Sequence, residues 1–137
     1  GAIHRAAGPE LLTECRMLNG CKTGQAKITK GYRLPAKYVI HTPGPVWNGG
    51  KRNEEELLKC CYENCLRLAA EYGCRIVAFP SISTGIYRFP LDKASVIAVG
   101  TILKFLALHS DMDVQMVCFD RKTFQYYQNA LEAAEGK

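Results

Sequence analysis

The chain has 137 residues, of which 47% are hydrophobic and 23% are charged, and its formal net charge is +5. These proportions exclude a disordered chain and a coiled coil, and the length is typical of one domain with a sizeable core. No block of five or more basic residues occurs. The charge therefore predicts modest attraction to anionic ligands and no dedicated nucleic-acid surface.

The first half of the chain predicts a helix, two strands and a second helix. Residues 2–18 carry apolar residues at helical spacing, with a break at Gly8-Pro9. Turn residues bound two predicted strands, at 27–30 and 38–42, and the prolines that follow force a loop. A capping-box pattern at Asn53 and Glu56 then begins a helix that ends at Gly73.

The second half alternates buried strands with helices. Residues 75–80 and 114–119 are continuous apolar runs, which are typical of strands covered on both faces. The helix between them, from Pro90 or Leu91 to about Leu108, is apolar almost all round and should be deeply packed. An amphipathic final helix is capped by Asp120 or Thr123. This order predicts a three-layer α/β domain whose sheet is largely parallel on its C-terminal side.

In such a sheet the ligand crevice lies beyond the carboxyl ends of the strands, which draws attention to loop 80–90. Its small and hydroxyl residues, from Ser81 to Tyr87, leave backbone N–H groups accessible, and Gly85 permits a positive φ. These features suit an anion cradle, most often for phosphate, although an ordinary Ser/Thr-rich turn also fits them. Neither a G-x-S-x-G elbow nor a P-loop is present, so the loop is expected to bind rather than attack.

Other candidate residues have both a functional and a packing interpretation. Phe119, at the end of the last strand, offers a flat face for a nucleobase or simply closes the core, and Tyr87 has the same two possibilities. Trp47 is expected to anchor its Gly-rich loop. We expect His4 and His41 to be structural histidines.

Seven cysteines, an odd number without any C-x-x-C pair, favour reduced thiols in a cytoplasmic compartment and no metal site. The pair four residues apart on the apolar helix face is expected to lie in the core. The longest strongly apolar stretch, 96–108, is too short to span a bilayer, so no membrane association is expected. The seven are Cys15, Cys21, Cys60, Cys61, Cys65, Cys74 and Cys118.

Six ordered segments, from residue 1 to about 120, resemble the macrodomain family, in its MacroD-like branch. They are Gly1-Ala2-Ile3-His4-Arg5-Ala6-Ala7-Gly8-Pro9, Gly24-Gln25-Ala26-Lys27-Ile28-Thr29, Leu34-Pro35-Ala36-Lys37-Tyr38-Val39-Ile40-His41-Thr42, Gly44-Pro45-Val46-Trp47, Asn53-Glu54-Glu55-Glu56-Leu57-Leu58 and Pro80-Ser81-Ile82-Ser83-Thr84-Gly85-Ile86-Tyr87.

The resemblance implies a mixed sheet between layers of helices, with ADP-ribose bound at the strand ends. Loop 81–87 would wrap the diphosphate and distal ribose with its backbone amides, and Phe119 would stack near the adenosine. The ADP-ribose-binding residues implied in this way are Ser81, Ser83, Thr84, Gly85, Ile86, Tyr87, Phe119 and Asp120.

The sequence also departs from the family pattern. Family members carry, before the position of Gly1, a strand ending in Ala-Ala-Asn, a glycine-rich loop and an Asp, and an earlier Asp that reads the adenine amine. Because these are absent here, we expect residues 1–137 to be a macrodomain whose N-terminal portion is missing. We also expect the catalytic Asn and Asp to lie upstream of Gly1, leaving no catalytic residue in this chain.

For the intact domain, the resemblance implies hydrolysis of ADP-ribosyl bonds on acidic residues of proteins, or of O-acetyl-ADP-ribose, without a cofactor. The implied partners are ADP-ribose and ADP-ribosylated proteins. One alternative is a reader module that binds ADP-ribose without turnover. Another is RNA or poly-nucleotide binding, suggested by the charge and Phe119, which predicts affinity that falls steeply with salt.

Overall fold

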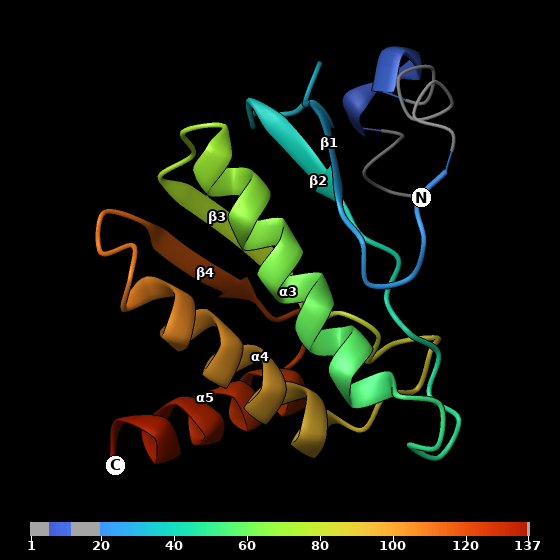
Figure 1. The fold of residues 1–137 in the computed structure, drawn as a ribbon, viewed down its shortest axis with the longest axis vertical. Coiled ribbons are helices and arrows are strands. Elements are labelled where there is room, and N and C mark those ends of the chain that lie inside the picture. Colours follow the sequence, from blue (N-terminus) through green and yellow to red (C-terminus); the bar gives the residue numbers. More distant parts are fainter. Residues whose placement is uncertain (1–5, 12–19, 137) are drawn as a thin grey trace.

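The computed structural model describes residues 6–11 and 20–136 of the chain. Its elements follow one another as β1 (Lys27–Lys30), β2 (Tyr38–His41), α3 (Glu54–Glu71), β3 (Ile76–Pro80), α4 (Leu91–Leu106), β4 (Asp113–Val117) and α5 (Arg121–Glu135) (Figure 1). The order and type of these elements confirm the sequence prediction. Of the helix expected over 2–18, residues 6–7 and 9–11 are helical, with Gly8 between them at φ 93°, and the rest lies outside the described residues.

The strands form one antiparallel and one parallel pair. Strands β1 and β2 are antiparallel, with Lys27 opposite His41, whereas β3 and β4 are parallel, with Ile76 opposite Asp113. The parallel pair confirms the prediction for the C-terminal half. It also brings the carboxyl ends of β3 and β4 to the same edge, where a ligand crevice is expected.

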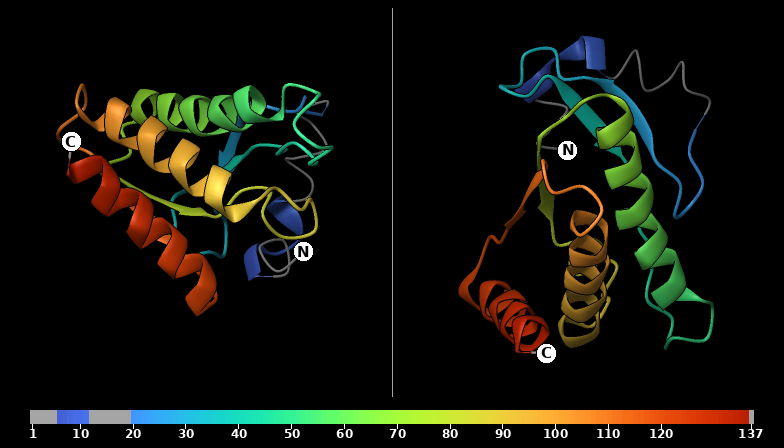
Figure 2. Two further views of the ribbon diagram at one scale, coloured as in Figure 1. Left: turned by 90° about the horizontal axis from the view of Figure 1, so that it is seen from below. Right: turned by 60° about the vertical axis from the view of Figure 1, so that its left-hand side comes forward.

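Helices α3 and α4 run side by side over the parallel pair, and α5 packs beside α4 (Figures 1 and 2). The buried core lies between these helices and the inward side of β3, and it includes Leu58, Tyr62, Leu66, Phe79 and Ala98. None of the helices in the described ranges combines the length and the apolar character that crossing a membrane requires.

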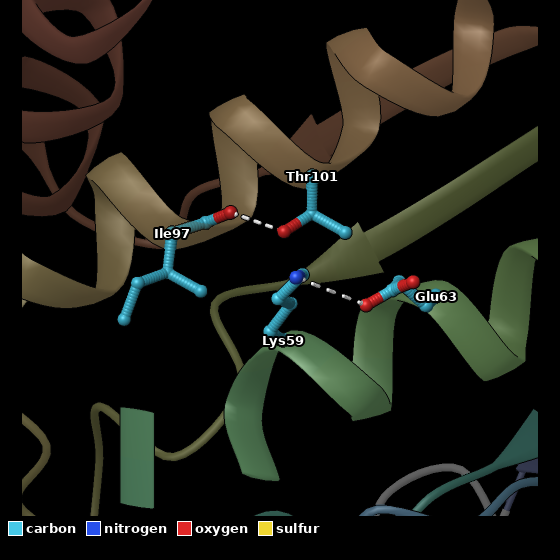
Figure 3. A network of polar contacts seen from close by, with 4 residues as sticks. All are labelled: Lys59, Glu63, Ile97 and Thr101. Atoms are coloured by element: carbon cyan, nitrogen blue, oxygen red, sulfur yellow. Dashed lines mark hydrogen bonds and ion pairs between the residues drawn. The ribbon is translucent and has the colours of Figure 1, made fainter. Parts of the chain in front are cut away.

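Where α3 faces α4, the polar groups are satisfied locally (Figure 3). The buried hydroxyl of Thr101 donates to the Ile97 carbonyl oxygen, one turn back in α4, at 2.7 Å. Such back-bonding lets a hydroxyl lie at a helix interface without an orphaned donor. On α3 the exposed ion pair of Lys59 and Glu63, at 3.8 Å, adds little stability.

Two of the predicted packing environments are only half right. In β3, Val77 and Phe79 face the helices, but Ile76 and Ala78 are exposed, so the described residues cover one face of this strand instead of two. Strand β4 alternates in the same way, with Gln115 and Val117 exposed. Likewise α4 packs deeply on its inner side while Val96 is 63% exposed. A continuous apolar run identifies a strand or helix, but it does not specify which faces the same chain covers.

Candidate functional site

The loops that leave the carboxyl ends of β3 and β4 enclose an open cavity of about 210 Å³. Its lining consists of Pro80, Ser81, Thr84, Gly85, Val117, Phe119, Asp120 and Thr123. Five of the eight residues implicated by sequence therefore meet here. The remaining three, Ser83, Ile86 and Tyr87, belong to the same loop but do not line the cavity.

Loop 81–89 presents a row of unused backbone donors. The Ile82 N–H donates to the Tyr62 hydroxyl, and two N–H groups further on close the loop onto its own carbonyl oxygens, Arg88 to Gly85 and Phe89 to Ser83. Between them, the N–H groups of residues 83–87 donate no hydrogen bond within the described chain, and those of residues 83–86 are the amides that the resemblance implicates. Four consecutive free N–H groups form a concentrated site of positive partial charge, which suits an anion.

The backbone of this loop is strained at a serine rather than at the expected glycine. Ser83 has a φ of 66° and Arg88 a φ of 60°, both in the left-handed region, whereas Gly85 has no positive φ. A Cβ at position 85 would meet no atom within 4 Å, so glycine here leaves room at the cavity instead of supplying a special φ. The Ser83 hydroxyl oxygen is buried and has no hydrogen-bond partner. Strain and an unsatisfied polar atom in one residue are typical of functional loops.

A neighbouring loop, residues 42–53, supports the cradle from the side (Figure 1). A side chain at Gly44 would collide with the Ser83 hydroxyl and with Ile82, so the close approach of the two loops requires glycine at 44. The Trp47 N–H donates to the Tyr87 carbonyl oxygen at 2.8 Å, and its indole lies 4.8 Å from the Phe89 ring. These contacts confirm that Trp47 anchors its loop, and they show that it anchors loop 81–89 as well.

Glu54 organises the loop that carries Trp47. Its buried carboxylate accepts hydrogen bonds from the N–H groups of Asn48, Gly50 and Arg52. Burial acts to raise the pKa of Glu54, but these backbone donors outweigh it and hold the pKa below its ordinary value. The predicted capping box is wrong, because Asn53 lies at φ 63° and makes no side-chain cap. The side chain that binds the backbone here is the carboxylate of the next residue, Glu54. The sequence pattern did not predict this role.

Exposed side chains stand on both sides of the cavity. Phe119 is 85% exposed, which excludes the interpretation that it closes the core. Asp120 caps α5 by accepting the Thr123 N–H at 2.7 Å, as predicted. This backbone hydrogen bond lowers the pKa of Asp120, so the carboxylate at the cavity is ionised. Ile86, 94% exposed, and Tyr87 stand at the outer rim of the loop.

Residues outside the cavity behave as structural groups. His41 Nε2 lies 2.9 Å from the Thr29 hydroxyl oxygen across the β1–β2 pair, while His4 falls outside the described residues. Cys61 and Cys65 are buried in the core, as predicted, and burial raises the pKa of Cys65 to about 12. Over residues 6–11 and 20–136, no three His, Cys, Asp or Glu side chains gather closely enough to hold a metal ion.

The family model "Macro domain" matches residues 1–98. The chain belongs to the macro domain family. A macro domain-containing protein of Chlorobaculum tepidum is 58% identical over 97% of this chain and 78% of its own length. An Oceanobacillus iheyensis macrodomain solved with ADP superimposes with a TM-score of 0.93 at 42% identity, covering 99% of this chain and 75% of that one. The α/β macrodomain fold is thereby confirmed.

Two further relatives have names that state an activity. The O-acetyl-ADP-ribose deacetylase of Enterobacter cloacae is 48% identical over 96% of this macro domain and 76% of its own length. The mouse ADP-ribose glycohydrolase MACROD2 is 54% identical over 96% of this chain but only 28% of its own length.

Proposed function

We propose that this macro domain binds ADP-ribose at the edge formed by β3 and β4 and takes part in hydrolysing bonds to ADP-ribose. The observation that carries the proposal is the row of four free N–H groups at residues 83–86, beside an open cavity. A diphosphate presents several acceptor oxygens to such a row, and fixed backbone donors hold an anion without a lysine or a metal.

The rest of the ligand would extend from the diphosphate in both directions. On one side Phe119 offers its exposed ring to the adenine, with Asp120 beside it. On the other side Tyr87 and Ile86, at the rim of the loop, would contact the distal ribose. Ser81, Thr84 and Gly85 line the space between these ends. Together with the Ser83 amide, which belongs to the row of N–H groups, this placement uses all eight of the residues implicated by sequence.

Hydrolysis is the finer part of the proposal, and the relatives named as a glycohydrolase and a deacetylase support it. The chemistry would be attack of water on the bond that joins the distal ribose to an acidic side chain of a protein, or to acetate. The described residues contribute binding and orientation: the amides hold the diphosphate, which fixes the distal ribose where water can reach it. The six described cysteines are free thiols, which supports a cytoplasmic location for this activity.

Calorimetric titration of the chain with ADP-ribose tests the binding step. We expect saturable one-to-one binding, with adenosine, which lacks the diphosphate, much weaker. Affinity should depend only modestly on salt, because the donors are backbone amides rather than a basic surface. No binding of ADP-ribose, or tighter and steeply salt-dependent binding of an RNA oligonucleotide, would contradict the proposal.

Turnover is tested separately with O-acetyl-ADP-ribose and with a protein mono-ADP-ribosylated on glutamate. Release of acetate or of free ADP-ribose, blocked by excess ADP-ribose, would support hydrolysis. Tight binding with no release from either substrate would overturn the hydrolytic part and leave the reader function.

A further inference from the structure

Two buried tyrosine hydroxyls lie beneath the ADP-ribose loop, one from each of two helices. Tyr62 belongs to α3 and is 0% exposed, and Tyr127 belongs to α5 and is 6% exposed. Neither residue lines the 210 Å³ cavity. Both rings belong to the hydrophobic core, which accounts for their size and apolar character but not for their hydroxyl groups.

The Tyr127 hydroxyl connects to the loop through side chains. It lies 2.7 Å from the Ser81 hydroxyl oxygen, which in turn accepts a hydrogen bond from the Thr84 hydroxyl at 2.8 Å. Thr84 also reaches the Ser81 carbonyl oxygen at 3.2 Å. Because Ser81 and Thr84 line the cavity, this chain of hydroxyls ties the start of the loop to its middle and both to α5.

The Tyr62 hydroxyl connects to the loop through the backbone. It accepts the Ile82 N–H at 3.2 Å, directly before the row of free N–H groups. Burial raises the pKa of Tyr62 well above its ordinary value, and it also raises that of Tyr127. Both phenols therefore stay protonated and can donate and accept at the same time.

We propose that Tyr62 and Tyr127 are positioning residues that hold the backbone amides of loop 81–87 in their anion-binding arrangement. The proposal rests on the proposed function, because it concerns the same loop. Ser83 is in a strained conformation, and four amides can converge on one diphosphate only if the backbone is held to within about half an ångström. The hydroxyls of Tyr62 and Tyr127, held on α3 and α5, supply that restraint without lining the cavity themselves.

The first test is Tyr127→Phe, which keeps the ring in the core and removes one oxygen. We expect ADP-ribose to bind roughly fivefold more weakly, the effect of one lost hydrogen bond, while the thermal midpoint changes little. Tyr126→Phe is the matched control, because Tyr126 neighbours Tyr127 in α5 and takes no part in the network. Equal affinity of the Tyr127→Phe variant and the wild type would overturn the proposal for Tyr127.

A double-mutant cycle separates positioning from general destabilisation. If Tyr127 acts through Ser81, combining Tyr127→Phe with Ser81→Ala should weaken binding no more than Ser81→Ala alone. The loss should also be confined to ligands that carry the diphosphate, leaving the weak affinity for adenosine unchanged. Additive losses, or an equal loss for adenosine, would mean that the hydroxyl has only a structural role.

Hydrogen exchange at the Ile82 amide tests Tyr62 without any ligand. In Tyr62→Phe this amide should exchange at least tenfold faster while the amides in the middle of α3 keep their protection. Unchanged exchange at Ile82 would overturn the role of Tyr62. If the wild-type chain fails to bind ADP-ribose, the proposed function is refuted. If the wild type binds and the Tyr62→Phe and Tyr127→Phe variants bind with the same affinity, only the positioning role is refuted.

Discussion

Two hollows among the described residues differ in size, and the larger of the two is not the proposed site. A cavity of about 280 Å³ lies between α4, β4 and α5, and its walls are mostly aliphatic, with Val99, Ile102, Val114, Met116 and Leu131 among them. The cavity of about 210 Å³ at the strand ends is smaller and more polar, and it adjoins four unused backbone N–H groups. The comparison teaches that fixed donors, rather than volume, identify the place where a charged ligand binds.

The two hollows also differ in how their walls are held. Side chains packed on two helices and a strand form the apolar cavity, so its shape follows from burial alone. Loops form the polar cavity, and Glu54, Trp47, Tyr62 and Tyr127 hold those loops by specific hydrogen bonds and ring contacts. Tyr127 belongs to both, because its ring lines the apolar cavity while its hydroxyl contacts Ser81. At the other residues, substitutions should therefore affect stability at the first hollow and ligand affinity at the second.

The largest effect is expected from Gly85→Glu. The Cβ at this position would meet no atom of the protein, so the fold should persist, but a carboxylate beside the cradle repels the diphosphate and fills its space. We expect ADP-ribose affinity to fall by about 100-fold or more, as two like charges in a confined site require.

Gly100→Glu is the matched control for this substitution. Gly100 is exposed on α4, and its Cβ would also meet nothing within 4 Å. It should leave calorimetric affinity for ADP-ribose unchanged. Near-wild-type affinity of the Gly85→Glu variant for ADP-ribose would refute the proposal that loop 81–87 binds the diphosphate.

A smaller effect is expected from Phe119→Ala. Because the ring is 85% exposed, its removal should not destabilise the fold, but it should remove adenine stacking, which is worth about 1–3 kcal/mol. The middle of this range, about 2 kcal/mol, corresponds to roughly 30-fold weaker binding of ADP-ribose by titration. Phe124→Ala, which alters the apolar cavity, serves as the comparison, and equal losses from both variants would refute stacking at Phe119.

Glu54→Gln should affect stability more than affinity. Since the folded pKa of Glu54 is lowered, the carboxylate stabilises the fold above the unfolded pKa of about 4.3, and this contribution is lost as pH falls through the folded pKa. At pH 7 the variant should melt several degrees lower and bind ADP-ribose a few-fold more weakly, because Trp47 loses its support.

Thermal melts from pH 7 to pH 3 check this account of Glu54. The difference in melting temperature between the wild type and Glu54→Gln should shrink as the pH falls. Glu55→Gln, at the exposed neighbouring residue, should behave as the wild type throughout. A difference that stays constant with pH would show that ionisation of Glu54 does not matter.

The smallest effect on binding is expected from Leu131→Ala. Leu131 lines the apolar cavity, so its truncation should lower the free energy of unfolding by about 2 kcal/mol. Affinity for ADP-ribose should stay within about twofold of the wild type. Denaturant unfolding and titration of the same sample measure both quantities. A large loss of affinity without a loss of stability would indicate that the apolar cavity, rather than the polar one, binds ADP-ribose.

Local patterns were sufficient to predict the strands, the helices and the position of the loop at residues 81–87. Periodicity, proline and glycine act within a few residues, so they can be read along the chain. The cap at Asp120 was predictable for the same reason. Gly85 lines the cavity, but the expected positive φ is wrong, because the left-handed residues of this loop are Ser83 and Arg88.

The residues that hold the site could not be predicted because their partners are distant in sequence. Tyr62 and Tyr127 lie on the apolar faces of their helices, so their spacing indicates only core, and their hydroxyls meet the loop 20 and 46 residues away in the chain. The role of Glu54 was not predicted, because the sequence around it also fits a capping box that begins at Asn53. Glu54 begins a helix and is buried, and its partners are backbone N–H groups of the preceding loop. This role is evident only once that loop is folded around the carboxylate.

The central claim is that the free amides of residues 83–86 hold the diphosphate, and an NMR titration of ¹⁵N-labelled protein with ADP-ribose tests it most directly. The account predicts saturable downfield shifts of the Ser83, Thr84, Gly85 and Ile86 amide protons, reproduced by ADP but not by adenosine. The amides around the apolar cavity should remain unshifted in the same spectra. Saturable binding that shifts the amide signals around the apolar cavity but leaves the signals of residues 83–86 unshifted would contradict the central claim.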